Sequence, residues 1–138
     1  MLWRKTLIYW RSIAVAGVIV YACLLREPSV ALPPIQGIDK YIHAFMYLVL
    51  ALMLQWDSKA TEWSRSADGN ACFGSWQWWF VTIGLPAILG GSIEVLQEKY
   101  FYPRTGDWMD WVADCIGIAA GVIIWWIGLK WHERRMAK

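Results

Sequence analysis

Acidic side chains, one histidine and one tyrosine recur at helical spacing in three short stretches of this 138-residue chain. Residues three or four positions apart lie on one face of a helix. Crowded, buried carboxyl groups have raised pKa values, so such a face can hold and transfer a proton near neutral pH. The spacing predicts an acid–base site where three helix ends meet. The three sets are Asp39, His43 and Tyr47; Glu94, Gln97 and Glu98; and Asp107, Asp110 and Asp114.

Several of these residues also have purely structural interpretations. Asp39 and Asp107 stand where helix N-caps belong. His43 can be a hydrogen-bonded packing residue. Glu94 and Asp114 are harder to explain in this way, because each lies about one turn inside its helix. A carboxylate inside a membrane is costly unless it is paired or hydrated, so these two are the strongest candidates for function.

Four apolar blocks must position these residues. The chain is 58% hydrophobic and contains 12 Trp. A helix needs about 20 residues to cross a hydrocarbon core of about 30 Å, and each block is close to that length. The blocks use nearly the whole chain, which predicts one all-α membrane domain over residues 1–138; a soluble helical bundle is the alternative. The four transmembrane helices are expected at roughly residues 7–25, 40–56, 78–97 and 108–129.

Two local features of the helices bear on their packing. Pro86 predicts a bend in the third helix, because proline cannot donate a backbone hydrogen bond. Gly117 and Gly121 continue the acidic stripe of the fourth helix and form a small-xxx-small pair, which is typical of a closely packed face. The acidic stripe is therefore expected to face the bundle.

Basic residues are unequally divided between the two predicted membrane sides. The termini and the loop at 57–77 carry nine Lys and Arg against four Asp and Glu, a net charge of +5. The loops at 26–40 and 94–114 carry four against seven, a net charge of −3. Because Lys and Arg concentrate on the cytoplasmic side, both termini are expected in the cytoplasm and the acidic site outside.

Three stretches resemble the VanZ-like family of small bacterial membrane proteins. They are DKYIHAFMY (39–47), EVLQ (94–97) and PRTGDWMDWVADCIGIAAG (103–121). The family shows Asp-Lys-x-x-His-x-x-x-Tyr, then Glu-x-x-Gln, then Arg-x-x-Asp-x-x-Asp before a glycine-rich helix, with Asn where this chain has Asp114. The resemblance implies a multi-pass protein of the bacterial cell (inner) membrane. The family's name-giving member is associated with resistance to teicoplanin, a lipid-tailed glycopeptide.

An enzyme is the first functional hypothesis. Its substrate would be a lipid-linked sugar or a phospholipid headgroup that reaches the site from the outer leaflet. Lys40 and Arg104 would bind a phosphate or pyrophosphate. No cofactor is predicted, although the carboxylates are also suitable ligands for a divalent cation. The candidate catalytic residues are His43, Glu94, Asp110 and Asp39.

A binding module without chemistry is the alternative, with a glycolipid or lipoglycopeptide as ligand. Carboxylates and amides accept hydrogen bonds from sugar hydroxyls, and aromatic side chains supply stacking surfaces. A transport element is a weaker hypothesis, because the inner half of the bundle lacks ionisable residues. The expected partners are membrane lipids and a lipid-linked or glycopeptide small molecule, with no nucleic acid. The candidate binding residues are Lys40, Gln97, Arg104, Asp107, Asp114, Tyr47 and Trp108.

Overall fold

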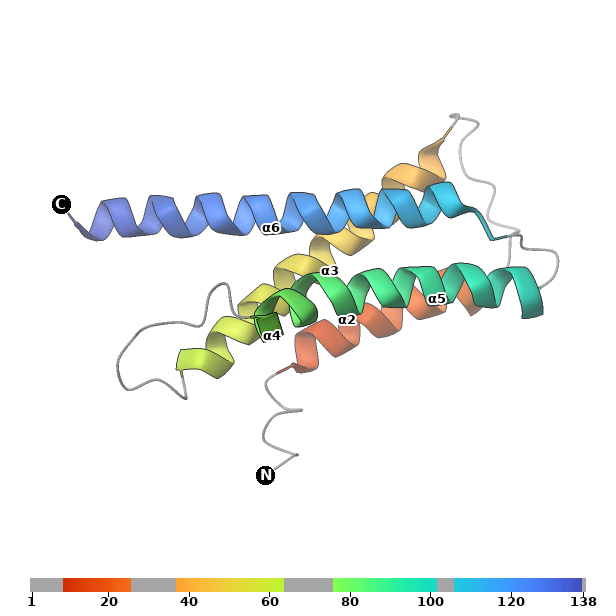
Figure 1. The fold of residues 1–138 in the computed structure, drawn as a ribbon, viewed down its shortest axis with the longest axis horizontal. Helices are drawn as coiled ribbons and strands as arrows, with labels where there is room; N and C mark the ends of the chain where they lie inside the picture. Colours follow the sequence, from red (N-terminus) through yellow and green to blue (C-terminus); the bar gives the residue numbers. More distant parts are fainter. Residues whose placement is uncertain (1–8, 26–36, 64–75, 102–105, 138) are drawn as a thin grey trace, which may run out of the picture.

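The structure, a computed structural model, describes residues 9–25, 37–63, 76–101 and 106–137. This part of the chain is helical almost throughout and contains no strand, which confirms the all-α prediction (Figure 1). Four helical rods are present, in the order predicted. Their elements are α2 (Trp10–Val20) with η1 (Tyr21–Leu25), α3 (Ile38–Trp63), α4 (Trp76–Trp79) with η2 (Phe80–Gly84) and α5 (Leu85–Tyr100), and α6 (Trp108–Met136).

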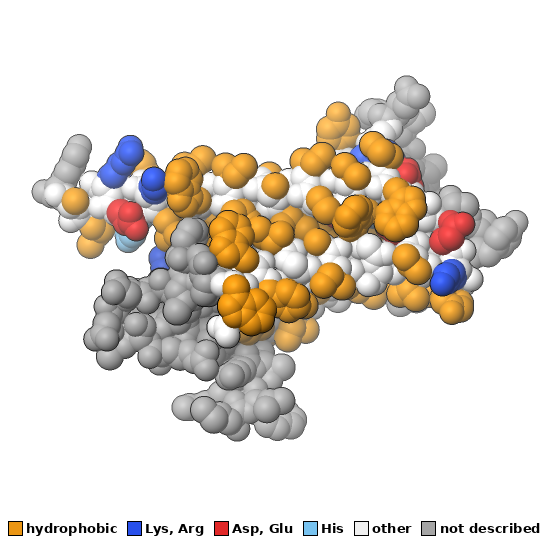
Figure 2. Space-filling model, in the orientation of Figure 1, with side chains coloured by type: hydrophobic (Ala, Val, Ile, Leu, Met, Phe, Trp, Pro, Cys, Tyr) orange, Lys and Arg blue, Asp and Glu red, His pale blue; other side chains and the backbone are white. Residues whose placement is uncertain are grey.

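Three of the rods are long and apolar enough to cross a membrane. They comprise Ile38–Lys59, Trp76–Tyr100 and Trp108–Met136. The first rod is apolar but shorter in its described part, at Trp10–Leu24. Large hydrophobic side chains cover the outer faces of α5 and α6, and charged side chains gather near the ends of the molecule (Figure 2). Such an apolar surface is what a lipid-facing bundle requires.

Helices α3 and α6 begin at the same end of the molecule and cross each other (Figure 1). The absence of side chains at two glycines of α6 permits their close approach. A Cβ added to Gly117 would lie 2.8 Å from the carbonyl carbon of Ala44 and closer still to its oxygen. A Cβ added to Gly121 would lie 2.8 Å from the Cβ of Ala51. The small-residue face predicted from the sequence is therefore the α3–α6 contact.

Proline disturbs the third rod in a specific way. Pro86 is the second residue of α5, and the turn that precedes α5, η2, is π-helical. Proline has no N–H for the carbonyl of Thr82 and crowds that turn, which explains a local departure from α-helical geometry. The Thr82 hydroxyl donates to the Trp78 carbonyl at 2.8 Å within the same region. The predicted bend thus takes the form of a π turn.

Helix α3 continues seven residues beyond its predicted end at residue 56. Asp57, expected in a polar loop, is instead helical and fully buried. Its carboxylate accepts from the backbone N–H of Ser12 at 3.1 Å and from its hydroxyl at 2.7 Å, and pairs with Arg11 at 3.2 Å. The expectation that this half of the bundle lacks ionisable residues was wrong, because α2 supplies the partners that make Asp57 tolerable there.

Candidate functional site

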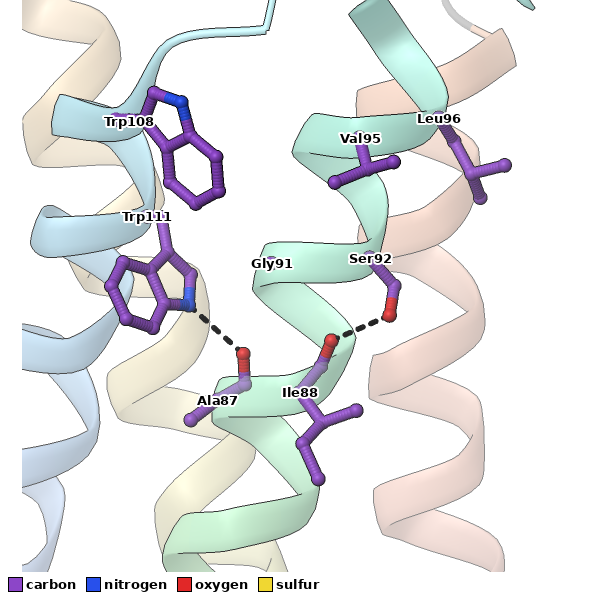
Figure 3. Close-up of a pocket in the computed structure, with 8 residues that line it drawn as sticks. All are labelled: Ala87, Ile88, Gly91, Ser92, Val95, Leu96, Trp108 and Trp111. Carbon is purple, nitrogen blue, oxygen red and sulfur yellow. Dashed lines mark hydrogen bonds between the residues drawn. The ribbon is translucent and has the colours of Figure 1, made fainter. Parts of the chain in front are cut away.

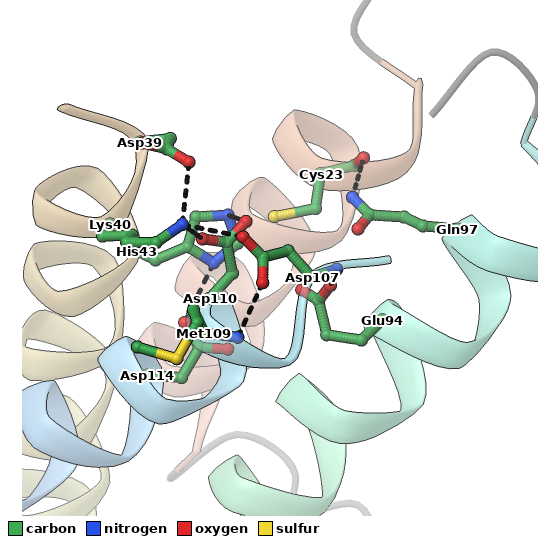
Figure 4. A network of polar contacts seen from close by, with 10 residues as sticks. All are labelled: Cys23, Asp39, Lys40, His43, Glu94, Gln97, Asp107, Met109, Asp110 and Asp114. Atoms are coloured by element: carbon green, nitrogen blue, oxygen red, sulfur yellow. Dashed lines mark hydrogen bonds and ion pairs between the residues drawn. The ribbon is translucent and has the colours of Figure 1, made fainter. Parts of the chain in front are cut away.

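Three helix ends meet at one end of the bundle and bring most of the predicted site residues together (Figure 4). The start of α3, the end of α5 and the start of α6 contribute. We call this group the polar cluster. It holds five carboxylates against one ammonium and one imidazole, which is a large excess of negative charge. Its members are Asp39, Lys40, His43, Glu94, Asp107, Asp110 and Asp114.

Lys40 bridges α3 and α6 through three carboxylates. Its Nζ lies 2.8 Å from Asp107, 3.0 Å from Asp110 and 3.3 Å from Asp39. The Asp107 carboxylate also accepts from the backbone N–H of Met109 at 2.8 Å, which confirms the predicted N-cap of α6. The Lys40 ammonium and this N–H together lower the pKa of Asp107 below its ordinary value. The ammonium is thus fully engaged within the protein.

Asp39 does not cap α3, contrary to one of its two interpretations. The helix already includes Ile38, and the turn before it contains Gly37 at a φ of 80°, a left-handed conformation that favours glycine. Asp39 therefore lies in the first turn of α3, where a carboxylate complements the helix dipole. It is half-exposed at the rim of the polar cluster.

His43 and Asp114 form a buried pair in the interior of the polar cluster. The imidazole Nδ1 lies 3.0 Å from an Asp114 oxygen, and Nε2 lies 3.9 Å from Asp110. The Asp114 side chain is 1% exposed and the His43 side chain is 13% exposed. A carboxylate that accepts from one ring nitrogen orients the ring and leaves the other nitrogen for chemistry. The pair therefore directs Nε2 toward Asp110.

Glu94 extends from α5 into the same interior. One of its oxygens accepts from the backbone N–H of Asp107 at 2.8 Å. Its other oxygen, Oε1, is buried and has no hydrogen-bond partner among the described residues. The Tyr47 hydroxyl is also buried and has no hydrogen-bond partner among the described residues. A Cβ at Gly90 would lie 3.3 Å from that hydroxyl and 2.6 Å from Asp114 Oδ2, so this glycine leaves room beside the buried polar atoms.

An open apolar groove of about 610 Å³ lies beside the polar cluster, between α5 and α6 (Figure 3). Trp111 forms part of its wall, and its indole N–H donates to the Ala87 carbonyl at 3.0 Å. Trp108, a predicted binding residue, borders the same groove and is largely exposed. The Trp111 ring also lies near the Gly90 position, which Asp114 Oδ2 approaches as well, so this ring connects the wall of the groove to the surroundings of Asp114.

Besides Tyr47 and Trp108, two further predicted binding residues are not members of the polar cluster. The side-chain amide of Gln97 donates to the Cys23 carbonyl at 2.8 Å and so joins α5 to η1 instead. Arg104 lies outside the described residues.

Sequence reasoning missed the buried group around Asp57 at the opposite end of the bundle. A signal was present, because Tyr47, Ala51 and Ser58 continue the inward face of α3 at helical spacing.

Comparison of the chain with protein families, curated proteins and solved structures finds no match.

Proposed function

We propose that the chain is a multi-pass protein of the bacterial cell (inner) membrane with both termini in the cytoplasm. The three long apolar rods support a membrane location. The excess of Lys and Arg at the termini and in the loop at 57–77 supports this orientation. The polar cluster then faces the outer surface, at the level of the lipid headgroups.

In this proposal the polar cluster acts on a lipid-linked envelope component or a lipoglycopeptide by general acid–base catalysis. The observation that carries it is the buried His43–Asp114 pair, whose Nε2 faces Asp110 inside a group of carboxylates. His43 would take a proton from a headgroup hydroxyl or a water at Nε2, and Glu94 or Asp110 would return one. Asp39, at the rim, would receive polar groups of the incoming substrate.

The proposed substrate class follows from the surroundings of the polar cluster. The apolar groove between α5 and α6 suits an acyl chain or prenyl chain, and the proposed ligand places its lipid tail there and its polar head at the polar cluster. Arg104 is proposed as a phosphate ligand. Lys40 can contact a phosphate only by exchanging one of its three carboxylate partners. The resemblance to VanZ-like proteins extends the proposal to teicoplanin, a glycopeptide with such a tail.

Ligand binding without chemistry is the second candidate, and the groove bordered by Trp108 favours it. An open apolar groove beside hydrogen-bond acceptors can retain a glycolipid or lipoglycopeptide without any reactive group.

Substitution in living cells tests these alternatives. We expect His43→Ala and Glu94→Ala to abolish the effect of the protein on lipid and cell-wall composition in a strain that lacks the native copy. Glu133→Gln, which removes an exposed carboxylate of α6 far from the polar cluster, is the matched control. Protein level is measured by immunoblot. Ligand retention is measured separately, with the purified protein. Loss of ligand retention along with function favours the binding module, and unchanged composition in both alanine variants contradicts the proposal.

Drug susceptibility tests the link to teicoplanin separately. If that link holds, cells with the protein should tolerate more teicoplanin than cells without it. The two kinds of cell should be equally sensitive to vancomycin. Equal shifts for both drugs would refute it.

A further inference from the structure

We propose that His43, Glu94 and Asp114 bind a divalent transition-metal cation, with Zn²⁺ as the best-suited ion. One ligand atom from each residue lies within 4.8 Å of the other two. The three residues come from α3, α5 and α6, so the site exists only where these helices meet (Figure 4). The inference deepens the proposed function, since it concerns the interior of the same polar cluster.

The ligand chemistry matches the proposed ion. One imidazole nitrogen and two carboxylate oxygens are suitable ligands for Zn²⁺, and three protein ligands leave a fourth position open for water. Ligand atoms about 2.1 Å from a tetrahedral ion are about 3.4 Å apart. His43 Nδ1 and Asp114 Oδ1 are already 3.0 Å apart. The other separations, which are at most 4.8 Å, must approach the same value for all three residues to bind one ion.

The unpartnered oxygen of Glu94 points independently to a missing cation. The residue is 3% exposed, and its Oε1 has no hydrogen-bond partner among the described residues. A carboxylate oxygen of Glu94 lies within 4.8 Å of ligand atoms of both His43 and Asp114. A buried polar atom without a partner is rare in native proteins. Lys40 does not serve as that partner, because its contacts are with Asp39, Asp107 and Asp110.

Charge balance favours the same conclusion. With His43 neutral, five carboxylates and the Lys40 ammonium leave the described polar cluster with a net charge of −4. A divalent cation halves this excess. Asp39, Asp107 and Asp110 also lie close enough for an ion, but the Lys40 ammonium is already bonded to all three. The interior set is therefore the one that lacks a cation.

Neighbouring groups are placed to orient two of the ligands. The Asp107 N–H holds the second oxygen of Glu94 at 2.8 Å. Asp110 lies 3.9 Å from His43 Nε2, beyond hydrogen-bond distance, and would have to approach the ring to accept the N–H of an imidazole that binds metal through Nδ1. With a metal bound, His43 would be a ligand, and the role of proton acceptor proposed above for His43 would fall to Asp110. A zinc-bound water has a pKa near 7, so it can supply hydroxide at neutral pH.

Metal titration of the purified full chain in detergent micelles, without a polyhistidine tag, tests the inference. After removal of metal with a chelator, we expect one Zn²⁺ per chain by equilibrium dialysis and elemental analysis. His43→Ala, Glu94→Gln and Asp114→Asn should each weaken Zn²⁺ binding at least tenfold. His132→Ala, which removes the other histidine, and Glu133→Gln, which removes an exposed carboxylate outside the polar cluster, should leave it unchanged. Circular dichroism verifies that each variant is folded.

Absence of Zn²⁺ binding by the folded wild-type protein would overturn the inference, as would equal losses in the Glu133→Gln and Glu94→Gln variants. Should the ligand variants not fold, Co²⁺ added to the wild-type protein decides the matter. A visible spectrum of tetrahedral Co²⁺ without a thiolate band supports the site, whereas a thiolate band assigns the ion to cysteine and refutes it. If no metal binds but His43→Ala still abolishes function in cells, the inference fails and the proposed function stands. If Zn²⁺ binds as expected but the variants do not change lipid or cell-wall composition in cells, the metal site stands and the proposed function fails.

Discussion

Replacing Gly117 by alanine should separate α3 from α6 and disturb the polar cluster. The added Cβ would lie 2.8 Å from the Ala44 carbonyl carbon, whereas ordinary contacts begin at 3.4 Å. The helices must move apart by at least the difference, 0.6 Å. His43 adjoins Ala44, so the same movement separates its imidazole from Asp114, which it contacts at 3.0 Å. Hydrogen bonds weaken steeply as donor and acceptor separate and lose their alignment.

The size of the effect follows from three contributions. Overpacking costs about 1–3 kcal/mol. Loss of a hydrogen bond to a charged group costs about 1.5–3 kcal/mol. The better helix propensity of alanine offsets about 1 kcal/mol. Gly117→Ala should therefore lower the free energy of unfolding by about 1.5–5 kcal/mol.

Gly128→Ala is the matched control, because a Cβ at that position of α6 meets no atom within 4 Å. It should be neutral or stabilising by up to about 1 kcal/mol. The assay is reversible unfolding in mixed micelles, followed by circular dichroism for both variants and the wild-type protein. Equal stability of the two alanine variants would refute the packing described for α3 and α6.

Three further predictions concern other polar contacts. Asp57→Ala should lower the free energy of unfolding by about 1–3 kcal/mol, because buried partners in α2 lose their acceptor; unfolding in micelles measures this, and a neutral result would contradict the burial of the group. Asp107→Asn keeps a capping side chain but removes the charge held by Lys40. Since the pKa of Asp107 is lowered in the folded protein, its stabilising effect is complete above the ordinary value of 3.8 and is lost as the pH falls through the folded-state value. Wild-type stability should thus fall more steeply than that of Asp107→Asn in this acidic range, and parallel pH profiles would argue against the ion pair. Gln97→Ala should cost about 1 kcal/mol through loss of its bond to Cys23, and an unchanged unfolding midpoint would show that this bond does not join α5 to η1.

The positions of the four helices could be predicted from the sequence because hydrophobic length alone specifies them. The convergence of Asp110, His43 and Glu94 was also predictable, since helical spacing assigns each to one face and short connections bring the ends together. The contact face of α6 followed from Gly117 and Gly121. These features depend on local pattern and chain length.

Other features depend on contacts between distant residues, so sequence pattern could not supply them. Asp57 resembles a loop residue until α2 brings Ser12 and Arg11 to it. Lys40 has the character of a phosphate ligand, but its three carboxylate partners come from α6 as well as α3. The amide of Gln97 sits at the spacing of the site residues, yet it bonds to η1. In each case a partner at least 45 residues away decides the role.

The origin of the polar cluster from three separate helices ties its chemistry to assembly. Before α3, α5 and α6 associate, Glu94 and Asp114 are isolated acids on single apolar segments, which a bilayer tolerates poorly. Association gives them neighbours and at the same moment brings them to His43. Under the proposed function, a newly inserted or partly degraded copy would be inert, and activity would begin only once the three helices have met.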